Sequence, residues 1–153
     1  MSRTATKKQT ASPDAYEDDF YRWCMDQSAM IRAGRIEDVD LAHLAEEVED
    51  MGGRDRREMT SRLVVLLMHL LKQAYQPRRR SRSWTATIVL QRSEIAGIFE
   101  QSPSLKAKAR SELSKAYRTA RQAAIAETGL SATAFPDICP WTVEQILDGS
   151  FLP

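Results

Sequence analysis

Cysteine is scarce in this sequence and no apolar run is long, and these two absences exclude several classes of protein. The two cysteines, Cys24 and Cys139, stand far apart, with no Cys-x-x-Cys pair and no cysteine–histidine cluster. This excludes a zinc-finger spacing and argues against a disulfide framework, so we expect a reducing, cytoplasmic compartment. The longest apolar run, residues 63–71, has nine members. A membrane-spanning helix needs about 20, so we expect no membrane span.

Recognisable catalytic motifs are also lacking. The sequence contains no P-loop, no Gly-x-Gly-x-x-Gly, no Gly-x-Ser-x-Gly and no His-Glu-x-x-His. A di-metal carboxylate site would need Glu-x-x-His on two helices, whereas here the order is reversed, as His43-x-x-Glu46, and occurs once. We therefore expect no metal and no cofactor, and we favour a protein that is not an enzyme. The first 13 residues are basic without an apolar stretch, so we expect a disordered tail and no secretory signal.

Charge is present in two opposed blocks, although the formal net charge is only +1. Residues 37–50 contain seven acids and no Lys or Arg, whereas residues 72–84 contain five bases and no acid. The acids are Glu37, Asp38, Asp40, Glu46, Glu47, Glu49 and Asp50, and the bases are Lys72, Arg78, Arg79, Arg80 and Arg82. The near-zero total therefore hides a polarised molecule.

Apolar residues recur at helical spacing along most of the chain, and glycine or proline separates the periodic segments. No alternating strand pattern of useful length occurs. The predicted helices cover residues 13–33, 40–51, 55–75, 84–101, 105–128 and 143–148. The sequence predicts an all-α fold, with residues 14–153 forming a single helical domain. Its five to six helices would form one compact bundle around the apolar helix at about residues 55–75.

Short motifs place the ends of these helices. Gly34, the Gly52-Gly53 pair and Gly129 are predicted to end helices, and Ser83 is predicted to cap the fourth. Asp55 with Glu58 resembles a capping box for the third helix, and Thr142 with Gln145 resembles one for the last. Ser12-Pro13 is the predicted start of the first helix.

Four polar residues are candidates for a small-ligand or catalytic pocket. His69 lies in the apolar third helix, where a hydrogen-bonded core histidine is the simpler interpretation and a general base or metal ligand is the alternative. Glu47 lies at the edge of an apolar face, and Gln91 and Arg92 lie along the fourth helix. Together these side chains are predicted to form a polar cluster, on which the hypothesis of an enzyme or small-ligand binder depends.

The arginines of the loop at residues 78–82 are the candidate partner-binding residues, namely Arg78, Arg79, Arg80 and Arg82. They can be solvated or paired with the acidic segment, within the chain or across a dimer. They can also bind a protein partner, or nucleic-acid phosphates with Trp84 stacking on a base. The pI of about 7.8 is below that of typical nucleic-acid modules. We therefore favour a protein-interaction domain or self-association, with nucleic-acid binding as the alternative.

Several segments agree in order and spacing with one known family. They are YEDDFYRWCMDQSAMIRAG, DLAHLAEEVEDMG, LLMHLLKQAYQPRRRSRSW with TIVLQR, SPSL, and FPDICPWTVEQILDGSFLP. Through these segments the chain resembles the bacterial domain-of-unknown-function family 29 from about Tyr16 to Pro153. The resemblance implies a compact helical, soluble bacterial protein. It implies no activity, substrate or catalytic residue.

Overall fold

The computed structural model describes residues 14–153, so the predicted tail and the Ser12-Pro13 cap lie outside the described residues. This part of the chain is mainly helical, and no strand occurs in it, which confirms the all-α prediction. The α-helices are α1 (Asp14–Asp18), α2 (Phe20–Arg32), α3 (Leu41–Tyr75), α4 (Arg82–Gln101), α5 (Leu105–Thr128) and α6 (Val143–Leu147). Short 3-10 turns are η1 (Ile36–Asp38), η2 (Pro77–Arg79) and η3 (Ala132–Ala134). None of the described helices is both long and apolar enough to cross a bilayer.

The chain divides into two compact units, at Met1–Met51 and Gly52–Pro153. We call residues 14–51 the N-terminal unit and residues 52–153 the C-terminal unit. The N-terminal unit contains α1, α2, η1 and the first turns of α3, and the C-terminal unit contains the rest of α3 and the later elements. That residues 14–153 form a single domain stays a prediction.

The predicted break at Gly52-Gly53 is wrong, because α3 runs without interruption from Leu41 to Tyr75. Positive φ angles occur only at Gly34 and Gly129 within the described residues, so both glycines of the pair keep a helical backbone. Glycine inside a helix costs roughly 1 kcal/mol relative to alanine, which the apolar periodicity on both sides offsets. Asp55 consequently lies inside the helix and does not cap it.

Other predicted ends differ by a few residues or are confirmed. The first predicted helix is divided at Asp19, whose side chain accepts a hydrogen bond from the Arg22 backbone N–H at 3.0 Å. Ser81 caps α4 in place of Ser83, because its hydroxyl accepts from the Trp84 N–H. Gly129 at φ +69° ends α5 as predicted, and α6 begins with the predicted Thr142–Gln145 capping box.

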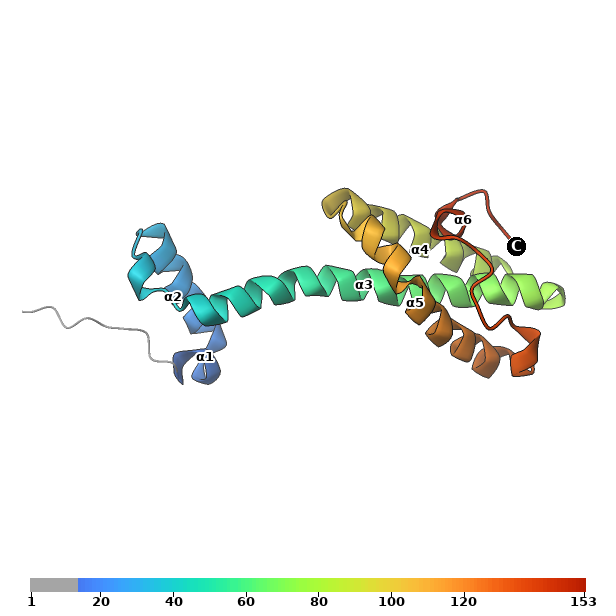
Figure 1. The fold of residues 1–153 in the computed structure, drawn as a ribbon, viewed down its shortest axis with the longest axis horizontal. Coiled ribbons are helices and arrows are strands. Elements are labelled where there is room, and N and C mark those ends of the chain that lie inside the picture. Colours follow the sequence, from blue (N-terminus) through green and yellow to red (C-terminus); the bar gives the residue numbers. More distant parts are fainter. Residues whose placement is uncertain (1–13) are drawn as a thin grey trace, which may run out of the picture. The chain divides into compact units, whose positions relative to one another are not determined.

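The core of the C-terminal unit is built on the apolar part of α3. Five leucines of α3 are buried there, which confirms the central position of this helix. They are Leu63, Leu66, Leu67, Leu70 and Leu71. Ile88 and Ile95 of α4 and the small residues of α5 pack into the same cluster, as do side chains of α6. Figure 1 shows α4, α5 and α6 gathered around this part of α3.

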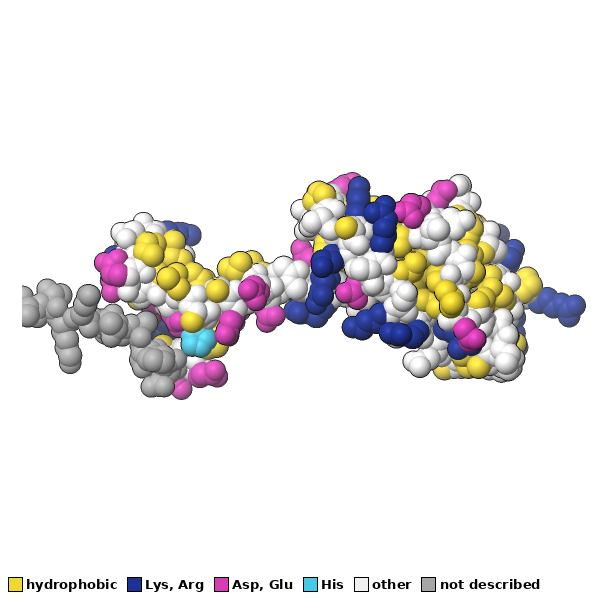
Figure 2. Space-filling model, in the orientation of Figure 1, with side chains coloured by type: hydrophobic (Ala, Val, Ile, Leu, Met, Phe, Trp, Pro, Cys, Tyr) yellow, Lys and Arg dark blue, Asp and Glu magenta, His cyan; other side chains and the backbone are white. Residues whose placement is uncertain are grey.

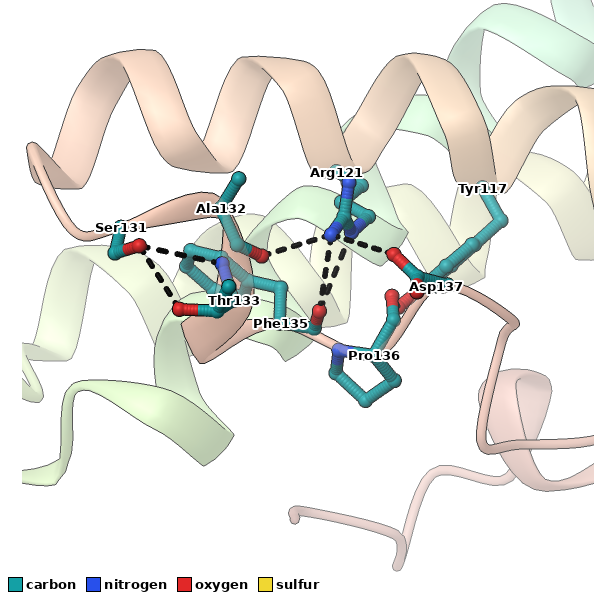
Figure 3. A network of polar contacts seen from close by, with 8 residues as sticks. All are labelled: Tyr117, Arg121, Ser131, Ala132, Thr133, Phe135, Pro136 and Asp137. Carbon is teal, nitrogen blue, oxygen red and sulfur yellow. Dashed lines mark hydrogen bonds and ion pairs between the residues drawn. The ribbon is translucent and has the colours of Figure 1, made fainter.

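The segment after α5 is fastened to that helix by Arg121. Its guanidinium donates to the carbonyl oxygens of Ala132 and Phe135 and to the Asp137 carboxylate, as Figure 3 shows. One turn earlier on α5, the Tyr117 hydroxyl donates to the Pro136 carbonyl at 2.7 Å. Side chains of α5 therefore hydrogen-bond three backbone carbonyls of the segment that follows it, those of Ala132, Phe135 and Pro136.

Candidate protein-binding groove

The N-terminal unit is assembled around the Tyr16 ring. This ring stacks on His43 of α3, with centroids 4.2 Å apart and planes inclined by 15°. It also meets Trp23 of α2 edge to face at 5.0 Å. The Tyr16 hydroxyl donates a hydrogen bond of 2.5 Å to Glu47 Oε1, and this bond raises the pKa of Tyr16 to about 12. Tyr16 therefore ties α1 to both α2 and α3.

A second set of polar contacts fixes the start of α3. Gln27 Oε1 accepts a hydrogen bond of 2.8 Å from the backbone N–H of Asp40. The Asp40 carboxylate accepts from the His43 backbone N–H at 3.3 Å and contacts His43 Nδ1 at 2.7 Å. This side-chain contact raises the pKa of His43 and lowers the pKa of Asp40. Asp40 thus serves both as helix cap and as the partner of His43.

Between α2 and the start of α3 lies a groove of about 520 Å³. Its apolar lining consists mainly of Phe20, Trp23, Ile31, Leu44, Val48 and Met51, and we call these six residues the apolar groove. Four of them are large and exposed: Phe20 at 48%, Ile31 at 43%, Val48 at 60% and Met51 at 64%. Figure 2 shows hydrophobic side chains gathered over α2 and the first turns of α3. Isolated exposed apolar residues are ordinary, whereas a continuous patch of them marks an interaction surface.

This exposure is concentrated in one unit. Eight of the twelve large exposed apolar side chains of residues 14–153 belong to the N-terminal unit, although it is the smaller one. Only Trp23 and Gln27 are buried among its described side chains. The Gln27 amide N–H₂, which is buried beside the groove, has no hydrogen-bond partner among the described residues. The unit therefore lacks a closed core of its own.

The groove also lies on the acidic part of the chain. The N-terminal unit has twelve acidic and three basic residues, a formal charge of −9. The C-terminal unit has nine acidic and sixteen basic residues, a formal charge of +7. Glu47 and Arg32 stand among the groove's lining residues. The groove lining is therefore mainly apolar, with one acid and one base, on a unit whose formal charge is −9.

Comparison with known proteins assigns the chain to a family. The model of the domain of unknown function DUF29 matches residues 15–152, which is nearly the whole chain. The chain belongs to the DUF29 family. No curated protein and no solved structure matches it. The DUF29 match confirms the resemblance and spans both units, and it brings no activity with it.

In this DUF29 chain no hydrogen bond among the described residues joins the four residues of the predicted polar cluster to one another. Glu47 belongs to the N-terminal unit and accepts from Tyr16. His69 is half-buried, and its Nδ1 lies 2.9 Å from the carbonyl oxygen of Val65, one turn earlier in α3. Gln91 is half-buried on α4. No metal-binding group of three His, Cys, Asp or Glu occurs within residues 14–153.

Arg92, the fourth member, anchors the C-terminal segment of the DUF29 chain. Its side chain is buried, Nε donates to the Ile146 carbonyl and Nη2 donates to the Phe151 carbonyl, each at 2.8 Å. Burial lowers the pKa of Arg92, and the carboxylate of Asp148 opposes this shift. A side chain that holds two backbone carbonyls has a structural role.

All four candidate arginines are exposed, and one of them, Arg80, also hydrogen-bonds backbone carbonyls. Arg80 donates from Nε to the Gln73 carbonyl and from Nη2 to the Pro153 carbonyl, each at 2.9 Å. Arg78, Arg79 and Arg82 are exposed and make no ion pair with another described residue. Trp84 is half-buried, and Lys72 Nζ lies 4.4 Å from its ring centroid, so this face of the indole is occupied.

The groove itself was missed by sequence reasoning. In the sequence, Leu44, Val48 and Met51 form one apolar stripe at helical spacing, as the residues of a buried helix face do. In the structure Cys24 is half-buried in the groove lining. A helical stripe indicates one apolar face and does not tell whether another element of the chain covers it. The only sequence feature that marks the groove's location is the excess of acidic residues at positions 37–50.

Proposed function

We propose that this protein is a protein-interaction module whose apolar groove binds an amphipathic helix with basic flanks. The observation that carries the proposal is an exposed apolar groove on a unit of charge −9. Helix-in-groove binding uses apolar side chains at helical spacing against such a groove, and complementary charge selects the partner. Phosphate groups are repelled by this charge, which favours a protein ligand over nucleic acid at the groove.

The expected contribution of the groove is sufficient for a specific complex. Full burial of a large apolar side chain contributes about 1.5–3 kcal/mol. Phe20, Ile31, Val48 and Met51 are about half exposed, so each has roughly half of that to gain on binding. An acceptor on the partner close to Gln27 would in addition satisfy its unpaired amide N–H.

The setting we propose is the cytoplasm of a bacterium. Both cysteines are unpaired thiols, which is usual in a reducing compartment. The family match and the charge distribution are compatible with this setting, and the partner would be a protein of the same compartment.

A labelled model peptide tests the proposal on the full chain. The peptide is helical, with leucines at helical spacing and lysines on both flanks, and its matched control carries glutamates in place of the lysines. We expect fluorescence anisotropy to show binding of the lysine peptide at about 50 mM salt, weakened at about 500 mM salt by screening. The glutamate peptide should bind at least about tenfold more weakly.

Two variants locate the binding site. Val48→Asp with Met51→Asp should reduce the affinity for the lysine peptide at least about tenfold, because both side chains line the groove. Ile138→Asp, at an exposed apolar position that does not line the groove, should leave it unchanged. Equal binding by the groove variant would contradict the proposal.

A DNA-binding experiment tests the alternative function. If the full chain binds a labelled DNA duplex but not the peptide, and Arg78→Ala, Arg79→Ala and Arg82→Ala together abolish DNA binding, nucleic acid is favoured instead.

A further inference from the structure

We infer that the ligand of the apolar groove is a second copy of this chain, which inserts the outer face of α4. This inference rests on the proposed function, because it names the partner of the same groove. Its basis is that each copy carries one uncovered acidic apolar groove and one uncovered basic apolar helix face.

The outer face of α4 has the form that the groove requires. Ala86, Val89 and Leu90 form an apolar strip on the surface of this helix, with Arg82 and Ser93 beside them. Val89 is 61% exposed and Leu90 is 54% exposed. The opposite face of α4 is already buried, through Ile88, Arg92, Ile95 and Phe99. Helix α4 is thus fixed in the C-terminal unit by one face and offers a second apolar face outward.

Charge complementarity selects this face for the groove. Arg82 begins α4, and Arg78 and Arg79 lie in η2 immediately before it, all three exposed and without an ion pair among the described residues. The groove lining contains Glu47 and Arg32, and Glu46 and Glu49 are exposed beside it on α3, so acids outnumber bases around the groove. Bringing a unit of charge +7 to a unit of charge −9 is favourable at low ionic strength and is weakened by salt.

A closed two-fold dimer is the assembly that we assign to these two surfaces. Since each copy has one groove and one α4 face, two copies can exchange them reciprocally about a two-fold axis. Such a dimer contains two identical groove–face contacts and leaves neither surface uncovered. A substitution that disrupts either surface is present in both copies, so it removes both groove–face contacts of the dimer.

Sedimentation of the full chain with two complementary variants tests the inference. The groove variant is Val48→Asp with Met51→Asp, and the face variant is Val89→Asp with Leu90→Asp. We expect the natural sequence to dimerise at about 50 mM salt and to dissociate towards monomer at about 500 mM. Each variant alone should be monomeric. An equimolar mixture of the two should form a heterodimer, because the intact face of one fits the intact groove of the other.

The mixture is examined up to about 1 mM, since one contact is weaker than two. Ile138→Asp, at an apolar position that is 82% exposed outside both surfaces, is the matched control and should dimerise normally. Circular dichroism establishes that each variant is folded. Persistence of the dimer in either variant, or failure of the mixture to associate, would overturn the inference.

The peptide experiment separates this inference from the proposed function. A natural sequence that is monomeric at every concentration but binds the lysine peptide through the groove overturns the second copy as partner and leaves the interaction module standing. A natural sequence that stays monomeric and binds neither peptide contradicts both this inference and the proposed function. Loss of the dimer on Arg78→Glu, Arg79→Glu and Arg82→Glu, with helical content unchanged, would support the assigned face.

Discussion

Arg92 shows how one buried side chain determines the course of the C-terminal segment. Its guanidinium donates to the carbonyls of Ile146 and Phe151, and neither carbonyl accepts another hydrogen bond from residues 14–153. We expect Arg92→Ala to lower the free energy of unfolding of the C-terminal unit by about 2–4 kcal/mol, because two charge-assisted hydrogen bonds are lost, one of them buried. Urea denaturation followed by circular dichroism measures this difference.

The exposed Arg82 is the matched control for Arg92. Arg82→Ala should change the free energy of unfolding by no more than about 0.5 kcal/mol, as is usual for surface positions. A similar loss in both variants would show that arginine on α4 acts through general charge and not through the two carbonyls.

The contact between His43 and Asp40 gives the N-terminal unit a pH dependence. The raised pKa of His43 stabilises the unit below its ordinary value of 6.5, and this contribution is lost as the pH rises through the folded-state pKa. The lowered pKa of Asp40 stabilises it above 3.8, and this contribution is lost as the pH falls through the folded-state pKa. We therefore expect the pair to stabilise the unit most between about pH 4 and 6.5.

Nuclear magnetic resonance of the His43 ring measures this directly. In the natural sequence its titration should lie above 6.5, and in Asp40→Asn it should return towards 6.5. Asparagine is as good a helix cap as aspartate, so this change removes the charge and keeps the cap. An unchanged His43 titration in the variant would assign the shift to other acids, such as Glu46 and Glu17.

At the scale of the helix, the sequence predicted individual helix ends well but did not predict that α3 is one uninterrupted helix. The end of α5 and the start of α6 were correct because Gly129 needs a left-handed backbone and because a capping box is a local hydrogen-bond pattern. The break at Gly52-Gly53 was wrong because two glycines weaken a helix without forcing it to end. Gly129 ends its helix because its backbone has a positive φ, whereas Gly52 and Gly53 keep a helical backbone. The sequence alone does not show which glycine adopts the positive φ.

Substitution by alanine should therefore act in opposite directions at Gly52 and Gly129. At Gly52 a Cβ meets nothing within 4 Å and the backbone is helical, so Gly52→Ala should stabilise the helix by roughly 0.5–1 kcal/mol. At Gly129, φ +69° strains any side chain, so Gly129→Ala should destabilise by roughly 1–2 kcal/mol. Thermal unfolding at 222 nm checks both, and a decrease for Gly52→Ala would show that α3 bends at this point.

At the scale of the whole molecule, the fold class followed from periodicity, whereas the division into units did not. The stripes on α2 and on the start of α3 resemble those of the buried helices, since both need one apolar face. Which stripe is covered depends on the number of helices that reach it, and this is a property of the tertiary structure. For the same reason the predicted cluster of Glu47 with His69, Gln91 and Arg92 could not be judged from spacing, although each residue type was reasonable.

The two units should consequently differ in stability. Seventeen buried apolar residues form one core in the C-terminal unit, whereas the N-terminal unit buries Trp23 and Gln27. We expect hydrogen exchange followed by mass spectrometry to find α2 amides exchanging at least about tenfold faster than those of residues 59–73, because opening a small unit costs less free energy. Occupation of the groove should slow α2 and leave residues 59–73 unchanged, since a ligand of the folded state stabilises only what it binds. Slow exchange of α2 in dilute monomer would contradict this, because it would mean that the groove needs no partner.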